Sequence, residues 1–124
     1  MSSILIELPF PPSVNSAYGR SKSSVFLNKK SKEYKQKARV SIRKEIRKHG
    51  YKKIDFLCRV KIVAFEPAHH VPDIDNIKKI LYDSITSASL WEDDRLIKSE
   101  SVDFQRNEHI RGKVYIEISP LIAN

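Results

Sequence analysis

The spacing of apolar residues along the chain predicts four strands, in which apolar side chains alternate with polar ones or form short runs. The predicted strands are residues 3–8, 56–65, 96–106 and 113–118. Glu66 and Pro67 end the second strand, because proline cannot donate to a sheet ladder. The third and fourth strands are predicted to pair as a hairpin joined across residues 107–112.

Two segments have the apolar spacing of a helix. The first, residues 31–49, has Ser31 as a suitable N-cap and ends just before Gly50. Its apolar stripe takes every fourth residue and consists of Tyr34, Ala38, Ile42 and Ile46. The second helix is predicted from residue 74 to about residue 88. Its buried face is predicted to consist of Ile74, Ile77, Leu81 and Ile85.

The segment between the first strand and the first helix, residues 9–30, is expected to be a long irregular stretch. Loops of that length inside compact domains are usually functional or disordered. The order β-α-β-α-β-β predicts an α+β fold in which two helices pack on one mixed sheet. At 124 residues the chain is predicted to be a single domain that covers residues 1–124.

The composition is that of a globular protein, with 40% hydrophobic and 31% charged residues. No apolar run is longer than the four residues Ile62–Phe65, so no segment is expected to span a membrane. The first residues lack the charged and apolar regions of a signal peptide. The single cysteine, Cys58, is expected to be a buried strand residue without a chemical role. These features predict a cytoplasmic protein.

The formal net charge of +8 is unevenly distributed. Residues 20–53 contain fourteen Lys or Arg and two acidic residues, whereas the rest of the chain has nine basic and thirteen acidic residues. A solvated helix surface explains part of this excess, but self-repulsion destabilises a protein unless an anion compensates it. The basic segment therefore predicts a polyphosphate partner, DNA or RNA.

Six of the fifteen acidic residues lie within 22 residues of this basic chain. They are Asp73, Asp75, Asp83, Glu92, Asp93 and Asp94. Asp73 can be the N-cap of the second helix, and Asp75 lies in its first turn, where carboxylates are stabilised. Asp75, Lys79 and Asp83 can also form an ion-pair ladder along the helix surface. Neither explanation accounts for the three consecutive acidic residues 92–94 that follow the helix.

A turn after the second helix and a returning strand would bring the two groups of carboxylates together. Clustered carboxylates raise one another's pKa or hold a hard cation, and oxygen ligands favour Mg²⁺ or Mn²⁺. An EF-hand calcium loop does not fit, because Ile77 and Lys78 follow Asp75 where further ligands and a glycine are needed. The adjacent His69 and His70 lack the spacing of zinc ligands. The three glycines form no Gly-rich phosphate loop, and no nucleophile elbow is recognisable.

The stretch "PDIDNIKK" (residues 72–79), followed by "LWEDDRLI" (residues 90–97), resembles the signature of the RusA family of Holliday junction resolvases. The segment "LPFPPSVNSAY" (residues 8–18) resembles the N-terminal segment of that family. Length and element order agree as well, so the resemblance covers essentially the whole chain. The chain departs from the family pattern at residues 87–89, 95–97 and 69–72. The last departure replaces arginines found in some relatives and so concerns local DNA contacts rather than catalysis.

The resemblance implies a small homodimeric endonuclease that nicks branched DNA, such as four-way junctions, with Mg²⁺ or with Mn²⁺ as a substitute. It implies that Asp73, Asp75 and Asp94 are metal-binding catalytic carboxylates and that Lys79 is a catalytic helper. The residues alone do not separate Asp94 from Asp93, and the resemblance selects Asp94. Neither a small-molecule cofactor nor a membrane partner is expected. Trp91 is expected to be a core residue beside the site rather than a base-stacking group.

DNA contacts are expected mainly from the basic segment and from the N-terminal loop. The candidates are Arg20, Lys22, Lys29, Lys30, Arg39, Arg43, Arg47 and Asn15. Two other functions compete with the nuclease. A non-catalytic nucleic-acid-binding module would bind junctions without Mg²⁺ dependence and leave the strands intact. A sugar-nucleotide transferase that uses D-x-D to hold a metal would need a longer chain and would leave the basic segment without a role.

Overall fold

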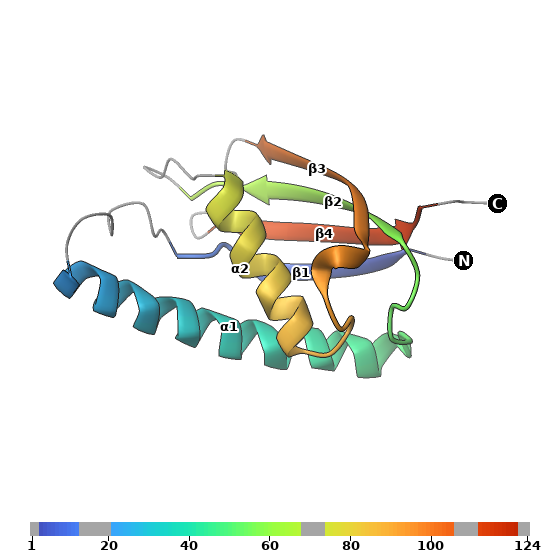
Figure 1. Cartoon of the computed structure of the whole chain (residues 1–124), viewed down its shortest axis with the longest axis horizontal. Helices are drawn as coiled ribbons and strands as arrows, with labels where there is room; N and C mark the ends of the chain where they lie inside the picture. Colours follow the sequence, from blue (N-terminus) through green and yellow to red (C-terminus); the bar gives the residue numbers. More distant parts are fainter. Residues whose placement is uncertain (1–2, 13–20, 68–73, 106–111, 122–124) are drawn as a thin grey trace.

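The computed structural model of the chain describes residues 3–12, 21–67, 74–105 and 112–121, without the side chains of residues 21–28 and 74. Its elements are β1 (Ile4–Pro9), α1 (Ser21–His49), β2 (Cys58–Phe65), α2 (Ile74–Ser87), the 3₁₀ helix η2 (Asp94–Leu96), β3 (Ile97–Gln105) and β4 (Lys113–Pro120). The predicted α+β fold is therefore confirmed, with four strands in one mixed sheet and two long helices (Figure 1).

The four strands form one sheet in the order β1-β4-β2-β3. β4 is antiparallel to both β1 and β2, whereas β2 and β3 are parallel. The predicted hairpin between the last two strands is therefore wrong, because β2 lies between them. β2, α2 and β3 form a crossover unit, in which the helix returns the chain to the same end of the sheet. β4 then pairs with the other side of β2, where Ile62 lies opposite Ile116.

The helix α1 is ten residues longer than predicted, since it begins at Ser21 and not at Ser31. Residues 21–30, expected to be irregular, are thus helical. This segment contains neither proline nor glycine, so nothing in it stops a helix that is held by its C-terminal half. Once a helix is nucleated, each added residue contributes one further hydrogen bond. The N-terminal extension carries the start of α1 beyond the sheet (Figure 1).

Both helices pack on one face of the sheet, and the hydrophobic core lies between these two layers (Figure 1). The predicted helical stripes are confirmed: Ala38 and Ile42 of α1 and Leu81 and Ile85 of α2 are at most 1% exposed. Each such burial contributes roughly 1–3 kcal/mol, depending on the size of the side chain. Of the remaining stripe residues, Tyr34 and Ile77 are buried and Ile46 is partly buried, while the side chain of Ile74 lies outside the described part.

The C-terminal end of α2 is closed by a Schellman motif. The Ser89 amide donates to the Thr86 carbonyl at 3.0 Å, and the Leu90 amide donates to the Ile85 carbonyl at 3.3 Å. Ser89 has a φ of 63°, a left-handed conformation that costs a non-glycine residue about 1 kcal/mol. Arg43 of α1 donates to the Ala88 carbonyl at 3.1 Å and so joins the two helices at this turn. The motif directs the chain towards η2.

Trp91 anchors the chain between α2 and η2. Its side chain is fully buried, and its Nε1 donates to the Thr86 hydroxyl at 2.7 Å, which confirms the prediction of a core residue. The Leu90 carbonyl next to it accepts from the Ile54 amide at 2.7 Å. Cys58 is also buried, as predicted. Among the described residues, no helix is long and apolar enough to cross a membrane.

Candidate active site

A hollow of about 460 Å³ lies between α2 and the first residues of β3. It contains three of the four residues that the resemblance assigns to catalysis, Asp75, Asp94 and Lys79. Its lining among the described residues is Asp75, Lys78, Lys79, Tyr82, Asp94, Ile97, Lys98, Ser99 and Glu100. The chain after α2 thus folds back, as expected, and places acidic residues from both ends of the helix–turn unit around one space. Asp73 lies outside the described residues.

The neighbouring Asp93 and Asp94 have different surroundings. Asp93 is the N-cap of η2, and its carboxylate accepts the Arg95 amide at 2.9 Å. This hydrogen bond, with a further one from Asp94, lowers the pKa of Asp93. Asp94 is exposed but lines the hollow, where desolvation and the neighbouring Asp93 carboxylate raise its pKa. The geometry therefore agrees with the choice of Asp94, since Asp93 is used to cap the 3₁₀ helix.

A third carboxylate of the hollow, Glu100 of β3, was not among the predicted site residues. Its Oε2 accepts from Lys78 Nζ at 2.8 Å, and its Oε1 accepts from the Tyr82 hydroxyl at 2.7 Å. These two hydrogen bonds lower the pKa of Glu100, and the bond from Lys78 contributes most. The same hydrogen bond raises the pKa of Lys78. Both groups are therefore charged at neutral pH, and together they join α2 to β3.

A β-bulge brings Glu100 to this position. In the pairing of β2 with β3, Cys58 lies opposite Ile97 but Arg59 lies opposite Ser99, so Lys98 is an extra residue. Beyond the bulge, Glu100 lies opposite the buried Val60 and thus on the helix-facing side of the sheet. Without the extra residue, Glu100 would lie on the opposite side. Nothing in the sequence around Lys98 marks the bulge, which explains why Glu100 was not among the predicted site residues.

The two adjacent lysines of α2 have different partners. Lys78 is 3.8 Å from Asp75 and 2.8 Å from Glu100. Lys79 is exposed and forms no ion pair with any residue that the structure describes. Asp83 pairs with Lys35 of α1 at 3.9 Å. The possible ladder from Asp75 through Lys79 to Asp83 is therefore not formed, and Lys79 extends from the helix next to Asp75.

The donor set of the hollow fits a hard divalent cation. Asp75 and Asp94 supply carboxylate oxygens, the ligands that Mg²⁺ and Mn²⁺ prefer, and neither histidine nor cysteine is part of the described lining. Desolvation, followed by the neighbouring Asp93 carboxylate, raises the pKa of Asp94, and a cation bound beside it would favour its charged form. Within the described residues, no three His, Cys, Asp or Glu side chains form a complete metal-binding group. A full ligand set therefore requires Asp73 or water oxygens in addition.

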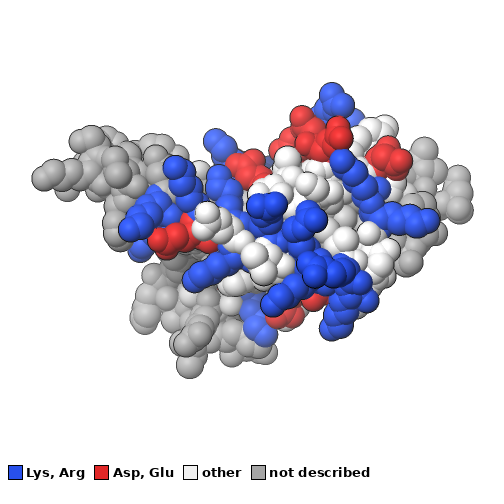
Figure 2. All heavy atoms as spheres, turned by 90° about the horizontal axis from the view of Figure 1, so that it is seen from below, with Lys and Arg blue, Asp and Glu red and all other residues white. Residues whose placement is uncertain are grey.

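The basic residues predicted to bind DNA are mostly on the exposed surface of α1. Those with described side chains are Lys29, Lys30, Arg39, Arg43 and Arg47, and all five are exposed. Figure 2 shows blue side chains spread over the face on which α1 lies, with few red ones among them. Arg43 also has the structural contact with Ala88 described above. Arg20, Asn15 and the side chain of Lys22 lie outside the described part.

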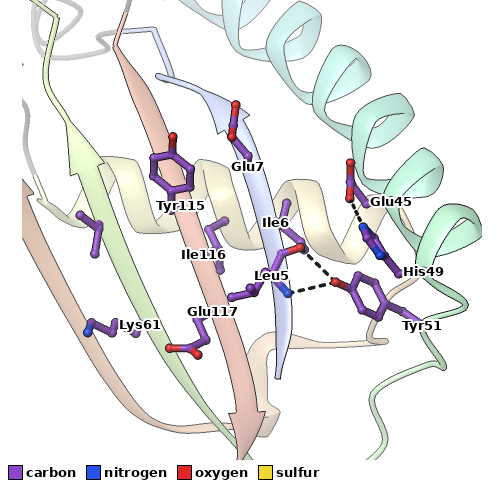
Figure 3. Close-up of a pocket in the computed structure, with 11 residues that line it drawn as sticks. Leu5, Ile6, Glu7, Glu45, His49, Tyr51, Lys61, Tyr115, Ile116 and Glu117 are labelled. Atoms are coloured by element: carbon purple, nitrogen blue, oxygen red, sulfur yellow. Dashed lines mark hydrogen bonds and ion pairs between the residues drawn. The ribbon is translucent and has the colours of Figure 1, made fainter. Parts of the chain in front are cut away.

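A second hollow, of about 530 Å³, lies on the face of the sheet that the helices leave open (Figure 3). Leu5 and Tyr115, exposed by 59% and 38%, form its apolar part. Glu7, Lys61 and Glu117 provide charges of both signs around it (Figure 3). The Tyr51 hydroxyl lies 3.3 Å from the amide and 3.4 Å from the carbonyl of Leu5 at the edge of β1. This hollow is distinct from the one between α2 and β3, since the two share no described lining residue.

A hollow lined by carboxylates and lysines, in a chain that also has a long basic helix, is typical of the class of proteins that bind and process nucleic acids. Comparison with known proteins agrees with this class and narrows it. The family model "Endodeoxyribonuclease RusA" matches residues 9–119. The matched region contains Asp75, Lys79 and Asp94.

Individual proteins similar to this chain also carry the name RusA. The chain is 33% identical over 91 residues to "Crossover junction endodeoxyribonuclease rusA" of Enterobacteria phage HK97, covering 70% of each chain. It is 26% identical over 97 residues to "Crossover junction endodeoxyribonuclease RusA" of Escherichia coli O139:H28, covering 78% of each. A relative from Escherichia coli K12 is 26% identical over 94 residues. The chain belongs to the RusA family of endodeoxyribonucleases.

The ion pair of Glu100 predicts a pH-dependent contribution to stability. Because its pKa is lowered in the folded state, this contribution is complete above the pKa of an unfolded glutamate, about 4.3, and disappears as the pH falls through the lower folded value. Wild-type protein should therefore be more stable than Glu100→Gln at pH 7, and the difference should shrink at pH 3. Urea unfolding at both pH values measures it.

The control is Glu33→Gln on the exposed surface of α1, where the glutamate forms no ion pair with a described residue. This variant should stay within about 0.5 kcal/mol of wild type at pH 7. A difference between wild type and Glu100→Gln that is as large at pH 3 as at pH 7 would contradict the ionic contribution.

Proposed function

We propose that this protein is a Mg²⁺-dependent, structure-selective endodeoxyribonuclease that resolves four-way DNA junctions by paired, symmetric nicks. The observation that carries the proposal is the hollow whose lining includes Asp75, Asp94 and Lys79, in a chain of the RusA family. The relatives named above are crossover junction endodeoxyribonucleases, so the substrate class is taken from them.

Hydrolysis of a phosphodiester needs a water nucleophile, compensation of the charge on the phosphate oxygens and a stabilised leaving oxygen. Asp73, Asp75 and Asp94 would hold the Mg²⁺ ion, and Mn²⁺ would substitute for it. When bound there, the ion supplies a more acidic water molecule and compensates negative charge. Lys79, one turn beyond Asp75, binds an oxygen of the scissile phosphate. Lys78 is less suited to that contact, because Glu100 holds its ammonium group.

The exposed basic surface of α1 supports binding of several DNA backbones at once. Between residues 29 and 49 the helix has ten Lys or Arg and two acidic residues. Contacts to phosphates position a protein on DNA without reading the DNA sequence. The preference for a junction therefore comes from the geometry of the converging DNA backbones. Arg20, Lys22, Lys29, Lys30, Arg39, Arg43, Arg47 and Asn15 remain the proposed DNA contacts.

Paired nicks require two active sites, and we propose that a two-fold symmetric dimer supplies them. The open face of the sheet is suited to the interface, because it is partly apolar and lies opposite the basic helix. Charges of both signs on this face can pair across a two-fold axis. The contacts of Tyr51 with Leu5 protect the edge of β1, which favours docking by faces over pairing of strand edges.

A gel assay tests the function directly. Purified protein is incubated with a synthetic four-way junction and with a linear duplex of the same sequence, each with and without Mg²⁺. Symmetric nicks in the junction, only with Mg²⁺ and much faster than in the duplex, are expected. Tight binding of the junction without cleavage under any metal condition would instead identify a non-catalytic binding module.

The carboxylates assigned to the metal should be required for cleavage but not for binding. Asp73→Asn, Asp75→Asn and Asp94→Asn should each reduce nicking by about a hundredfold or more, since even outer residues of metal sites contribute 10–100-fold. Junction binding should be unchanged or tighter, because each variant removes repulsion from phosphate.

Two variants serve as controls for charge. Asp93→Asn removes the cap of η2, and Asp83→Asn removes the contact with Lys35, but neither residue lines the hollow. Both should nick within about tenfold of wild type, a loss typical of modest indirect effects. Cleavage by Asp75→Asn or Asp73→Asn at the wild-type rate would refute the metal assignment.

Lys79 should act on the chemical step, unlike the lysines of α1. Lys79→Ala should lower the single-turnover nicking rate by about a hundredfold, the typical effect of removing one group that stabilises transition-state charge. Lys48→Ala should weaken binding slightly and reduce the slope of log K against log salt by about 0.9. Equal effects of the two variants on single-turnover cleavage would remove Lys79 from the mechanism.

The dimer should be sensitive to the open face of the sheet. Light scattering at micromolar concentration should report about twice 14.4 kDa for wild type and 14.4 kDa for Leu5→Arg, which buries an unpaired charge in the interface. Val40→Arg is the matched control, since Val40 of α1 is 56% exposed but lies on the helix side. A monomeric wild type that still makes paired symmetric nicks would refute the dimer.

A further inference from the structure

Lys78 lies between two carboxylates of the hollow that contains Asp75 and Asp94. Its ammonium nitrogen is 2.8 Å from Glu100 Oε2 and 3.8 Å from Asp75 Oδ1. The shorter distance is a hydrogen bond between charged groups, whereas the longer one is an ion pair without close contact. A positive charge this near to Asp75 competes with any metal ion that binds there, so the position of the ammonium group matters for metal affinity.

The Glu100 carboxylate is itself held in place. The Tyr82 hydroxyl donates to its second oxygen at 2.7 Å, and the Tyr82 side chain is only 7% exposed. The Tyr82 ring packs edge-to-face against Trp91, with 5.9 Å between ring centroids. Trp91 is fully buried and hydrogen-bonded to Thr86. The partner of Lys78 is therefore anchored in the core, whereas Asp75 is 91% exposed.

We infer that Glu100 is a positioning residue of the metal site: it holds the Lys78 ammonium in a 2.8 Å hydrogen bond, keeps its distance from Asp75 at 3.8 Å, and so limits its competition with a divalent cation at Asp75. This inference rests on the proposed function, because it assumes that Asp75 binds metal. Without the charge of Glu100, the nearest described carboxylate to Lys78 is Asp75, three residues away on the same helix. The ammonium group could then approach Asp75 more closely than 3.8 Å, and a metal ion would have to displace it.

Glu100 is not a metal ligand in this arrangement. One of its oxygens accepts from Lys78 and the other from Tyr82, so both face donors already. A direct ligand and a positioning residue predict different results when Lys78 is also changed. A ligand contributes to metal affinity whether or not Lys78 is present, whereas a residue that acts through Lys78 has no effect once the ammonium group is gone.

A double-mutant cycle with Glu100→Gln and Lys78→Met tests the inference. Mn²⁺ binding to the protein without DNA is measured by calorimetry, and the Mg²⁺ concentration for half-maximal nicking is measured in parallel. Glu100→Gln should weaken Mn²⁺ binding by about tenfold, the lower end of the effect of residues that orient metal ligands. Lys78→Met should bind Mn²⁺ at least as tightly as wild type, and the double variant should match Lys78→Met within about twofold.

The matched control is Glu92→Gln. Glu92 also accepts from a lysine, Lys53, at 3.0 Å, but it does not line the hollow. This variant should bind Mn²⁺ as wild type does. Circular dichroism of every variant shows that it is folded, and nicking by Glu100→Gln should return towards the wild-type rate at high Mg²⁺ concentration, which a disrupted fold would not allow.

Three results would overturn the inference while leaving the proposed function intact. In the first, wild type binds Mn²⁺ and nicks junctions, and Glu100→Gln has unchanged Mn²⁺ affinity. In the second, Glu100→Gln still weakens binding when Lys78 is methionine, which would make Glu100 a direct ligand. In the third, Lys78→Met itself weakens Mn²⁺ binding. A wild-type protein that neither binds Mn²⁺ nor nicks junctions would overturn the proposed function and the inference together.

Discussion

The ion pair between Lys78 and Glu100 joins the two elements, α2 and β3, that line the hollow with Asp75 and Asp94. Lys78 belongs to α2, whose first turn holds Asp75, and Glu100 belongs to β3, which follows Asp94 within a few residues. Carboxylates repel one another when they are held close, so a cation placed among them stabilises the folded chain before any metal binds. The hydrogen bond from the buried Tyr82 fixes this pair to the hydrophobic core.

Basic residues are concentrated on α1, whereas the hollow where α2, η2 and β3 meet combines charges of both signs. Its lining contains three carboxylates and three ammonium groups, those of Asp75, Asp94 and Glu100 and of Lys78, Lys79 and Lys98. α1 packs against α2, with Lys35 of α1 near Asp83 of α2. Under the proposed function, α1 would hold DNA backbones, and the hollow would supply carboxylates for a metal ion and a lysine for the phosphate.

Several local features were predictable because neighbouring residues determine them. The apolar stripes of both helices and the burial of Trp91 and Cys58 follow from periodicity and polarity over short distances. The N-terminal ten residues of α1 were not predicted, because they lack the stripe that identifies the rest of the helix. The hairpin was predicted wrongly, because strands that are adjacent in sequence usually pair, and the insertion of β2 between β3 and β4 is a choice of the whole sheet.

The sequence by itself determined the fold class, the basic segment and the two acidic groups around the second helix, and its resemblance to the RusA family selected Asp73, Asp75, Asp94 and Lys79 among the candidates. Tertiary structure alone decided which of Asp93 and Asp94 lines the hollow and which lysine is held by a partner. It also added Glu100, which is 22 residues from Lys78. The physical reason is the bulge at Lys98: one extra residue turns every later side chain of β3 to the other face, and nothing in the local sequence indicates where that shift falls.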